Sequence, residues 1–153
     1  MDDLDQKALR LLMENARMSW AELAQSLGLS PPAAADRAHK LQELGVIRGY
    51  AALVNSEAVG YPLVAFVSVL LGDQRKRATF LNGIRKLDEV LECHHVAGDD
   101  DYLLKIYCRG TRDLNRILVE ELKGKLGVGR TRTTIVLETS KESVRIPIAD
   151  VAE

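Results

Sequence analysis

The spacing of apolar residues changes near residue 50, and that change limits the folds open to this chain. Between residues 4 and 44 the apolar side chains recur at the spacing of helices that bury one face. After residue 60 they instead form runs of strand length, and the run over residues 63–71 is apolar on both alternating faces. The sequence therefore predicts a helical first part and a second part built on a β-sheet.

Three short helices are expected in the first part, each with one apolar face to bury. Their inward-facing residues are Leu4, Ala8, Leu11 and Leu12, then Leu23, Ala24 and Leu27, then Ala34, Ala38 and Leu41. Residues that favour helix ends lie at the expected boundaries. They are Asp3 or Asp5 before the first helix, Ser19 with Glu22 before the second, Gly28 after it, Ser30 with Pro31 before the third, and Gly45 after it.

The second part alternates strands and helices in the order β-α-β-β-α-β. Strands are predicted over residues 63–71, 90–97, 102–108 and 130–137, with helices around residues 80–87 and 114–122. A four-residue hairpin turn, 98–101, joins the middle strands and pairs Ala97 with Tyr102. We therefore predict an α+β chain: an N-terminal helix-turn-helix domain, winged-helix-like, over residues 1–50, a linker over 51–61, and a C-terminal ferredoxin-like βαββαβ domain over 62–153.

One face of the predicted sheet has no helix to cover it. Both helices of the βαββαβ order lie on the same face, so the apolar residues of the other face stay exposed in a single chain. A contiguous exposed apolar patch usually marks an interface. We therefore expect a homodimer in which the sheet packs against the sheet of a second copy.

The composition is that of a globular protein. Hydrophobic residues make up 46% and charged residues 28% of the 153 residues, and the net charge is −1, so a disordered chain and a strongly basic nucleic-acid coat are both excluded. No apolar run reaches the roughly 18 residues that a membrane span needs. The acidic start, residues 1–5, differs from the basic start of a signal peptide, so we expect a cytoplasmic protein with no membrane partner.

The two cysteines, Cys93 and Cys108, are too few for a disulfide framework and lack the spacing of a zinc site. His94 and His95 follow Cys93, but adjacent residues on a strand point to opposite faces and cannot converge on one ion. The predicted hairpin places Cys93 opposite Ile106, so the two thiols form a diagonal pair about 7–8 Å apart, too far for an easy disulfide. We predict packed thiols, with no metal and no cofactor.

The second helix, a short turn containing Gly28 and the third helix form the helix-turn-helix pattern. In that geometry the third helix enters the major groove of DNA, and its outward residues reach base edges. Three-helix units also occur in proteins that bind no DNA, which leaves a DNA-independent sensor as an alternative. The predicted DNA contacts are Ser30, on phosphate, then Pro32, Ala33, Asp36, Arg37, His39 and Lys40 along the helix, and Arg48 in the segment beyond it.

Motifs along nearly the whole chain share the pattern of one known family. They are residues 4–12, 15–19, 22–24, 28–30, 45–50, 60–61, 65–67, 90–93, 98–104, 127–128 and 131–137, with Arg37, Leu41, Lys141 and Pro147. In these segments the chain resembles the leucine-responsive regulators, also called the Lrp/AsnC or feast/famine family. Two positions depart from the pattern, because Pro32 stands where the family often has serine and Asp36 where a basic residue is common.

The resemblance implies a sequence-specific DNA-binding transcriptional regulator whose assembly and operator binding are modulated by a small effector, typically an amino acid. The family commonly forms dimers and rings such as octamers, with the effector between neighbouring dimers. The predicted hairpin turn over residues 98–101 agrees in part with amino-acid binding, since its backbone N–H groups suit a carboxylate and its acidic side chains suit an ammonium group. Turns of this composition are also ordinary in hairpins that bind no ligand. The matching site residues are Gly98, Asp99, Asp101, Tyr102, Thr133 and Thr134.

An enzyme is the other alternative. The sequence has no phosphate-binding loop, no nucleophile motif with a placed base and no His-Glu metal spacing, so we predict a non-enzyme. A minority of helix-turn-helix proteins with a similar second domain look like siroheme decarboxylases. The Gly49-Tyr50 pair after Arg48 and the Gly-Asp-x-Asp-Tyr turn over 98–102 favour the regulator over that enzyme.

Overall fold

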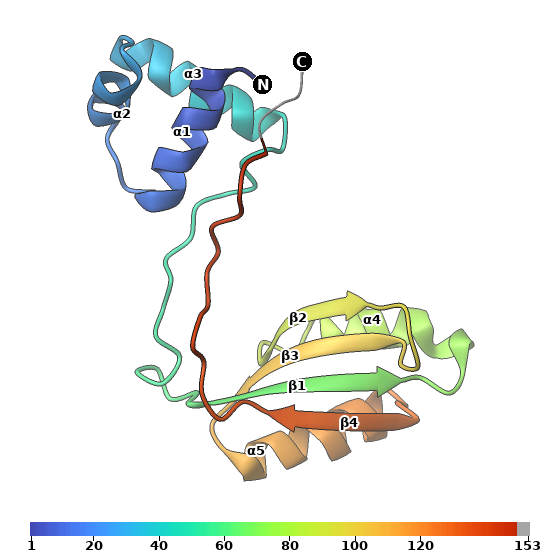
Figure 1. Ribbon diagram of the computed structural model, residues 1–153. Helices are drawn as coiled ribbons and strands as arrows, with labels where there is room; N and C mark the ends of the chain where they lie inside the picture. Colours follow the sequence, from blue (N-terminus) through green and yellow to red (C-terminus); the bar gives the residue numbers. More distant parts are fainter. Residues whose placement is uncertain (150–153) are drawn as a thin grey trace. The chain divides into compact units, whose positions relative to one another are not determined.

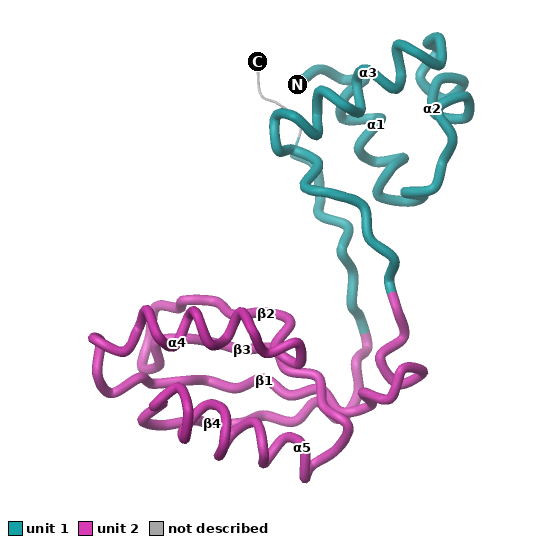
Figure 2. Tube along the Cα trace, turned by 180° about the vertical axis from the view of Figure 1, so that it is seen from behind, with its two compact units in different colours: residues 1–53, 141–153 teal, residues 54–140 magenta. Residues whose placement is uncertain are grey.

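The computed structural model describes residues 1–149, which divide by their internal contacts into two compact units (Figures 1 and 2). Residues 1–53 group with those from 141 onward, and residues 54–140 form the second unit. Within the first unit, Arg145 Nη1 lies 3.9 Å from Glu14 Oε1. The sequence boundaries instead assign residues 141–149 to the second domain, whose last residues, 150–153, lie outside the described part of the chain.

The first unit contains the three predicted helices, α1 (Asp3–Glu14), α2 (Trp20–Leu27) and α3 (Pro31–Glu43). Their apolar faces meet in one core. The α3 residues buried in this core are Ala34 and Ala38, whose small side chains let the helix approach its neighbours closely. The predicted inward set is confirmed in this core. Its buried members are Ala8, Leu12, Leu23, Ala24, Leu27, Ala34 and Ala38.

The predicted start of α1 was wrong by one position. Asp2, not Asp3 or Asp5, is the N-cap, because its extended backbone lets its carboxylate accept from the Asp5 N–H at 2.8 Å. Asp5 in return accepts from the Asp2 N–H at 2.9 Å, which completes a capping box. The capping box of Ser19 and Glu22 before α2 is confirmed.

Arg37 ties α3 to the start of α1. Its Nη1 donates to both carboxylate oxygens of Asp2, at 2.7 and 2.8 Å, and also to Asp5. The hydrogen bond from the Asp5 N–H, reinforced by Arg37, holds the pKa of Asp2 below its ordinary value of 3.8. The same acids raise the pKa of Arg37. The N-terminal acids of α1 thus orient α3 through a charge-assisted contact.

The second unit is a four-stranded antiparallel sheet in the order β2-β3-β1-β4. Its strands are β1 (Leu63–Leu70), β2 (Val90–His95), β3 (Tyr102–Cys108) and β4 (Arg130–Ile135). A short 3₁₀ turn, η1 (Gln74–Lys76), leads into α4 (Arg77–Ile84), and α5 (Thr111–Arg116) continues as a π-helix, η2 (Ile117–Lys125). Figure 1 shows these helices on one side of the sheet. The predicted ferredoxin-like βαββαβ order is confirmed.

Alternate residues of the central strands form the core beneath the helices. Ala65, Val67 and Val69 of β1 are fully buried against helix residues such as Phe80 and Ile117. The intervening residues of β1 face the other way and lie outside this core. Phe66 among them is 37% exposed. The uncovered apolar face predicted from the sequence is therefore present in the chain.

The β2–β3 hairpin differs from its prediction. Tyr102 pairs with His95 rather than Ala97, so Cys93 lies opposite Leu104 and not Ile106, and the connecting loop spans residues 96–101. A bulge between Val90 and Glu92 completes the shift in register. The reason is tertiary, because the N–H of Asp101 donates to the Val69 carbonyl at 2.8 Å and draws the start of β3 toward β1.

The Asp2 contacts make the stability of the helical unit depend on acid pH. A carboxylate whose pKa is lower in the folded than in the unfolded state stabilises the fold at pH values above its unfolded-state pKa. This stabilisation is lost as the pH falls through the folded-state pKa. We expect urea unfolding, followed by the fluorescence of Trp20, the single tryptophan, to shift to lower urea between about pH 6 and pH 3.

The matched variants for this prediction are Asp2→Asn and Asp3→Asn. Asparagine still caps a helix but does not titrate, so Asp2→Asn should flatten the acid dependence. Asp3→Asn removes an equal charge at an exposed neighbour and should leave the dependence as in the parent chain. Parallel acid profiles for the parent chain and Asp2→Asn would contradict the assignment.

Candidate DNA-binding helix and effector loop

The turn between α2 and α3 has the geometry of a helix-turn-helix. Gly28 ends α2 with φ +69°, a left-handed conformation that glycine adopts without strain. Ser30 caps α3, its hydroxyl oxygen accepting from the Ala33 N–H at 3.4 Å, and Pro31 occupies the first helical position. The Ser30 hydroxyl proton stays available as a donor at the start of α3.

The outward face of α3 carries most of the predicted DNA contacts. Pro32, Asp36, His39 and Lys40 are exposed, and Ala33 is half-buried. Arg37 does not share their freedom, because its guanidinium is held by the acids of α1 and its side chain is only 26% exposed. Arg48 is exposed in the extended segment after α3.

Sequence reasoning missed Trp20 beside this face. The indole, at the first position of α2, meets the His39 ring edge to face, with ring centroids 5.6 Å apart. This contact limits the directions that the imidazole can take. The available signal was a lone tryptophan directly after the Ser19 cap, where an apolar residue is not needed for the core.

The three acids of the β2–β3 loop take three different roles. The carboxylate of Asp101 accepts from the Leu71 N–H at 2.8 Å and from Gln74 Nε2 at 3.2 Å, which fixes the loop to the segment after β1. Asp100 is buried and pairs with two arginines. Asp99 is exposed and makes no hydrogen bond or ion pair with any residue of 1–149. Gly98 precedes it with φ +144°.

The remaining predicted effector residues point in different directions. Tyr102 is buried beneath the loop, where its hydroxyl accepts from Arg77 Nε at 2.7 Å and its ring meets His95. Thr133 pairs with buried Val67 and so faces the helices, whereas Thr134 pairs with Phe66 and faces the open side. The two threonines therefore face opposite sides of the sheet, and a single chain does not bring both of them to one site.

Asp100 and its two arginines are a cluster that the sequence reasoning did not identify. Arg132 Nη2 lies 2.7 Å and Arg130 Nη2 3.3 Å from the Asp100 carboxylate, whose side chain is 7% exposed. The arginines are two positions apart on β4 and thus share a face. The cluster joins the loop to the edge strand β4. The alternating arginines of residues 130–132 were the signal in the sequence.

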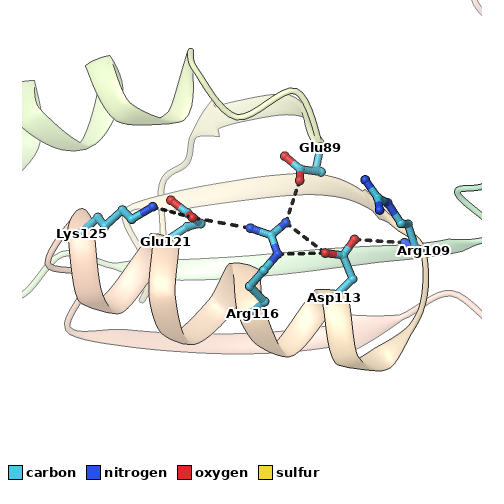
Figure 3. Close-up of polar contacts among 6 residues, drawn as sticks. All are labelled: Glu89, Arg109, Asp113, Arg116, Glu121 and Lys125. Atoms are coloured by element: carbon cyan, nitrogen blue, oxygen red, sulfur yellow. Dashed lines mark hydrogen bonds and ion pairs between the residues drawn. The ribbon is translucent and has the colours of Figure 1, made fainter.

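A second polar cluster supports the helical layer (Figure 3). Arg116 donates to Glu89 at 2.7 Å and to Asp113 at 3.0 Å, and it lies 3.5 Å from Glu121, which also pairs with Lys125. Burial favours the neutral form of Asp113, but the hydrogen bonds from Arg109 and Arg116 outweigh it and lower its pKa. Each acid is already paired, so this cluster positions the helix and offers no free acid or base.

The cysteines and histidines do not form a metal site. Burial, with Asp113 and Glu89 nearby, raises the pKa of the Cys108 thiol to about 11, and Cys93 packs at the edge of the same core. His94 points to the opposite face from Cys93, as predicted, where its Nε2 lies 3.0 Å from Glu92. Residues 1–149 contain no group of three side chains placed to hold a metal ion.

Removing the Asp100 carboxylate should loosen β4 and the loop together. Charge-assisted hydrogen bonds at a buried acid are lost in Asp100→Asn, but the arginines are largely solvated, so we expect a loss of about 1–2 kcal/mol. The measurement is chemical unfolding with hydrogen exchange of the β4 amides. Asp99→Asn, at the exposed neighbour, should stay within about 0.5 kcal/mol of the parent chain. Equal effects of the two substitutions would refute the assignment.

Comparison with known proteins identifies both units. The AsnC-type helix-turn-helix domain matches residues 1–42, and the Lrp/AsnC ligand binding domain matches residues 64–146. No helix within residues 1–149 combines the length and apolar character needed to cross a lipid bilayer.

Full-length relatives match over nearly the entire chain. The chain is 37% identical to the leucine-responsive regulatory protein of Escherichia coli K12, over 97% of this chain and 92% of that protein. It is also 37% identical to the proline dehydrogenase transcriptional activator of Rhizobium radiobacter, over 94% of this chain and 93% of the relative.

Solved structures agree with these relatives. A transcriptional regulator of Neisseria meningitidis in complex with L-Met has a TM-score of 0.91 and 32% identity, covering 96% of both chains. Escherichia coli AsnC has a TM-score of 0.88 and 30% identity, covering 96% of this chain and 99% of that one. The resemblance found in the sequence is confirmed, and the chain belongs to the Lrp/AsnC family of DNA-binding transcriptional regulators with an effector-binding domain.

Proposed function

We propose that α3 is the recognition helix and that its solvent-exposed polar face contacts DNA in the major groove. The observation that carries this proposal is the row of exposed polar residues on a helix whose start is capped by Ser30. Its members, Asp36, His39 and Lys40, form no hydrogen bond or ion pair with residues 1–149. Pro32 and Ala33 allow close approach, His39 and Lys40 supply donors, and the Ser30 hydroxyl and Arg48 reach phosphate. Arg37 acts differently from its predicted role, orienting α3 through Asp2 and Asp5.

The test measures, by fluorescence anisotropy, the affinity of the protein for a labelled duplex from the region upstream of its own gene. This affinity is compared with that for a scrambled duplex at about 50 and 200 mM salt. We expect a preference for the upstream duplex that survives the higher salt. Lys40→Ala should lower the slope of log affinity against log salt by about one unit, because a cation that displaces condensed counterions from the DNA is lost. Lys86→Ala, an exposed lysine of the second unit, is the matched control. An unchanged slope in Lys40→Ala contradicts its role.

We further propose that the effector is an amino acid bound at the loop over residues 96–101. Asp99 is the acid of this loop whose side chain is left without a partner among residues 1–149, so it suits an ammonium group. The backbone around Gly98 suits a carboxylate. Asp101 and Tyr102 position the loop, and Thr133 or Thr134 completes the site from a neighbouring copy. The L-Met complex of the Neisseria meningitidis relative supports this class of ligand.

Isothermal titration with the common amino acids tests this site. One or more should release heat with the parent chain, and Asp99→Asn should weaken that binding at least about tenfold, since an ammonium loses a charge-assisted hydrogen bond of about 1.5–3 kcal/mol. Asp88→Asn, which removes an exposed acid elsewhere in the same unit, is the control and should bind as the parent does. No heat from any amino acid with the parent chain contradicts the proposal.

We propose that the open face of the sheet forms a homodimer, which assembles further into an octamer. Phe66, with Val64 and Leu70 on the same face, is the apolar surface that a second copy would cover. Phe66→Lys should convert the dimer to a monomer in light scattering at micromolar concentration. Val119→Lys on the helical side, where Val119 is 50% exposed, should not. A parent chain that is already monomeric, or a dimeric Phe66→Lys, overturns the proposed interface.

We propose that the chain acts by binding and not by catalysis. The acids of the Figure 3 cluster are each paired with a cation, and the pKa of the Cys108 thiol is too high for it to act as a nucleophile near neutral pH. The relatives' names describe transcriptional regulators and support the same conclusion.

A further inference from the structure

The centre of the exposed face of α3 is an acid. Asp36 lies two positions from both Ala34 and Ala38, the fully buried residues of this helix, and two positions correspond to about 200° of rotation around an α-helix. Its carboxylate therefore points away from the core. Pro32 and Lys40 lie one turn before and after it on the same face, as residues four apart do.

Nothing in the described chain neutralises this acid. Asp36 forms no hydrogen bond or ion pair with any residue from 1 to 149. Arg37 is next to it in the chain, but its guanidinium is occupied by Asp2 and Asp5 of α1. The structure thus keeps the neighbouring cation away from Asp36 and leaves a free carboxylate in the middle of the recognition face.

A free carboxylate in the major groove can accept hydrogen bonds but cannot donate them. Phosphate oxygens, guanine O6 and N7, and thymine O4 are all acceptors and repel it. The available donors are the amino groups of cytosine N4 and adenine N6. Adenine places its N7 acceptor beside N6, which suits the mixed amide of asparagine better than a carboxylate, so cytosine is the better partner.

We propose that Asp36 is a specificity-determining residue that selects a cytosine in each half of the operator. The proposal rests on α3 being the recognition helix, as proposed above. Lys40 follows about 6 Å further along the helix axis, a distance of roughly two base-pair steps. A lysine there donates to guanine O6 and N7, so the chain favours a guanine within about two base pairs of that cytosine. Asp36 then contributes to specificity even though it lowers general affinity for phosphate.

The experiment is selection of bound duplexes from a randomised pool by the full-length protein, followed by sequencing. The parent chain should enrich a cytosine at one position of each half-site. Asp36→Asn should change that preference to adenine, because asparagine matches adenine N6 and N7. Asp36→Ala should lose the preference at that position and keep the rest of the site. Asp88→Asn removes an equal charge from the second unit and should select the parent sequence.

A second measurement uses only the parent chain and so does not depend on how a variant folds. Replacing the selected cytosine with 2-pyrimidinone removes its N4 amino group, and this should weaken binding about 5- to 150-fold, the range expected for one base contact. Unchanged affinity for this duplex overturns the proposal, as does the same cytosine preference in Asp36→Ala. Adenine in the parent selection overturns the choice of base.

Failure of the proposed recognition helix gives a different result from failure of the Asp36 assignment. A parent chain that enriches no sequence at all overturns sequence-specific binding and, with it, the role of Asp36. A parent chain that enriches a site whose sequence is unchanged in Asp36→Ala, while Lys40→Ala alters it, leaves the recognition helix in place and removes Asp36 from it.

Discussion

The second unit depends on the strict alternation of its central strand. Ala65, Val67 and Val69 are directed to one face of the sheet, where two helical segments cover them, and the residues between them are directed to the other. A βαββαβ order places both helices on the same side, so the chain cannot cover its second face with its own elements. The fold that builds the core therefore also creates the apolar surface through which we propose that copies associate.

The loop between β2 and β3 shows how structural roles limit functional ones. Asp101 holds the loop to the chain after β1, and Asp100 holds it to β4 through two arginines. In each residue the contact occupies the carboxylate that would otherwise pair with the ammonium group of a ligand. Asp99 remains as the exposed acid of a loop that Asp100 and Asp101 attach to the rest of the unit.

The same division of labour occurs on α3. Arg37 and Asp36 are adjacent and opposite in charge, yet they do not neutralise each other, because Arg37 is occupied by the two acids at the start of α1. The cation thus becomes an internal contact that orients the helix. The acid becomes the exposed group at the centre of the outward face of α3, the face that we propose contacts DNA, and the chemistry of this face differs from that of a purely basic surface.

The sequence was enough to determine the family, the helix-turn-helix and the order of strands and helices. It also identified the capping residues Ser19 and Ser30. These features depend on local spacing: apolar periodicity, turn residues and caps act over a few positions. Even the error at Asp2 was one position within the correct capping pattern. The open face of the sheet could also be predicted, because strand alternation is a local property too.

The tertiary structure alone decided which charged groups are free. The ion pair of Arg37 with Asp2 joins residues more than thirty positions apart in the sequence, as does that of Asp100 with Arg132. The hydrogen bond of Asp101 with the Leu71 N–H joins residues 30 positions apart. The β2–β3 register also depended on a bond to Val69 of a third strand. No local pattern encodes such partners, since a carboxylate has the same side chain whether it is paired or free. Which acid pairs with a distant cation and which stays exposed is settled only when distant segments come together.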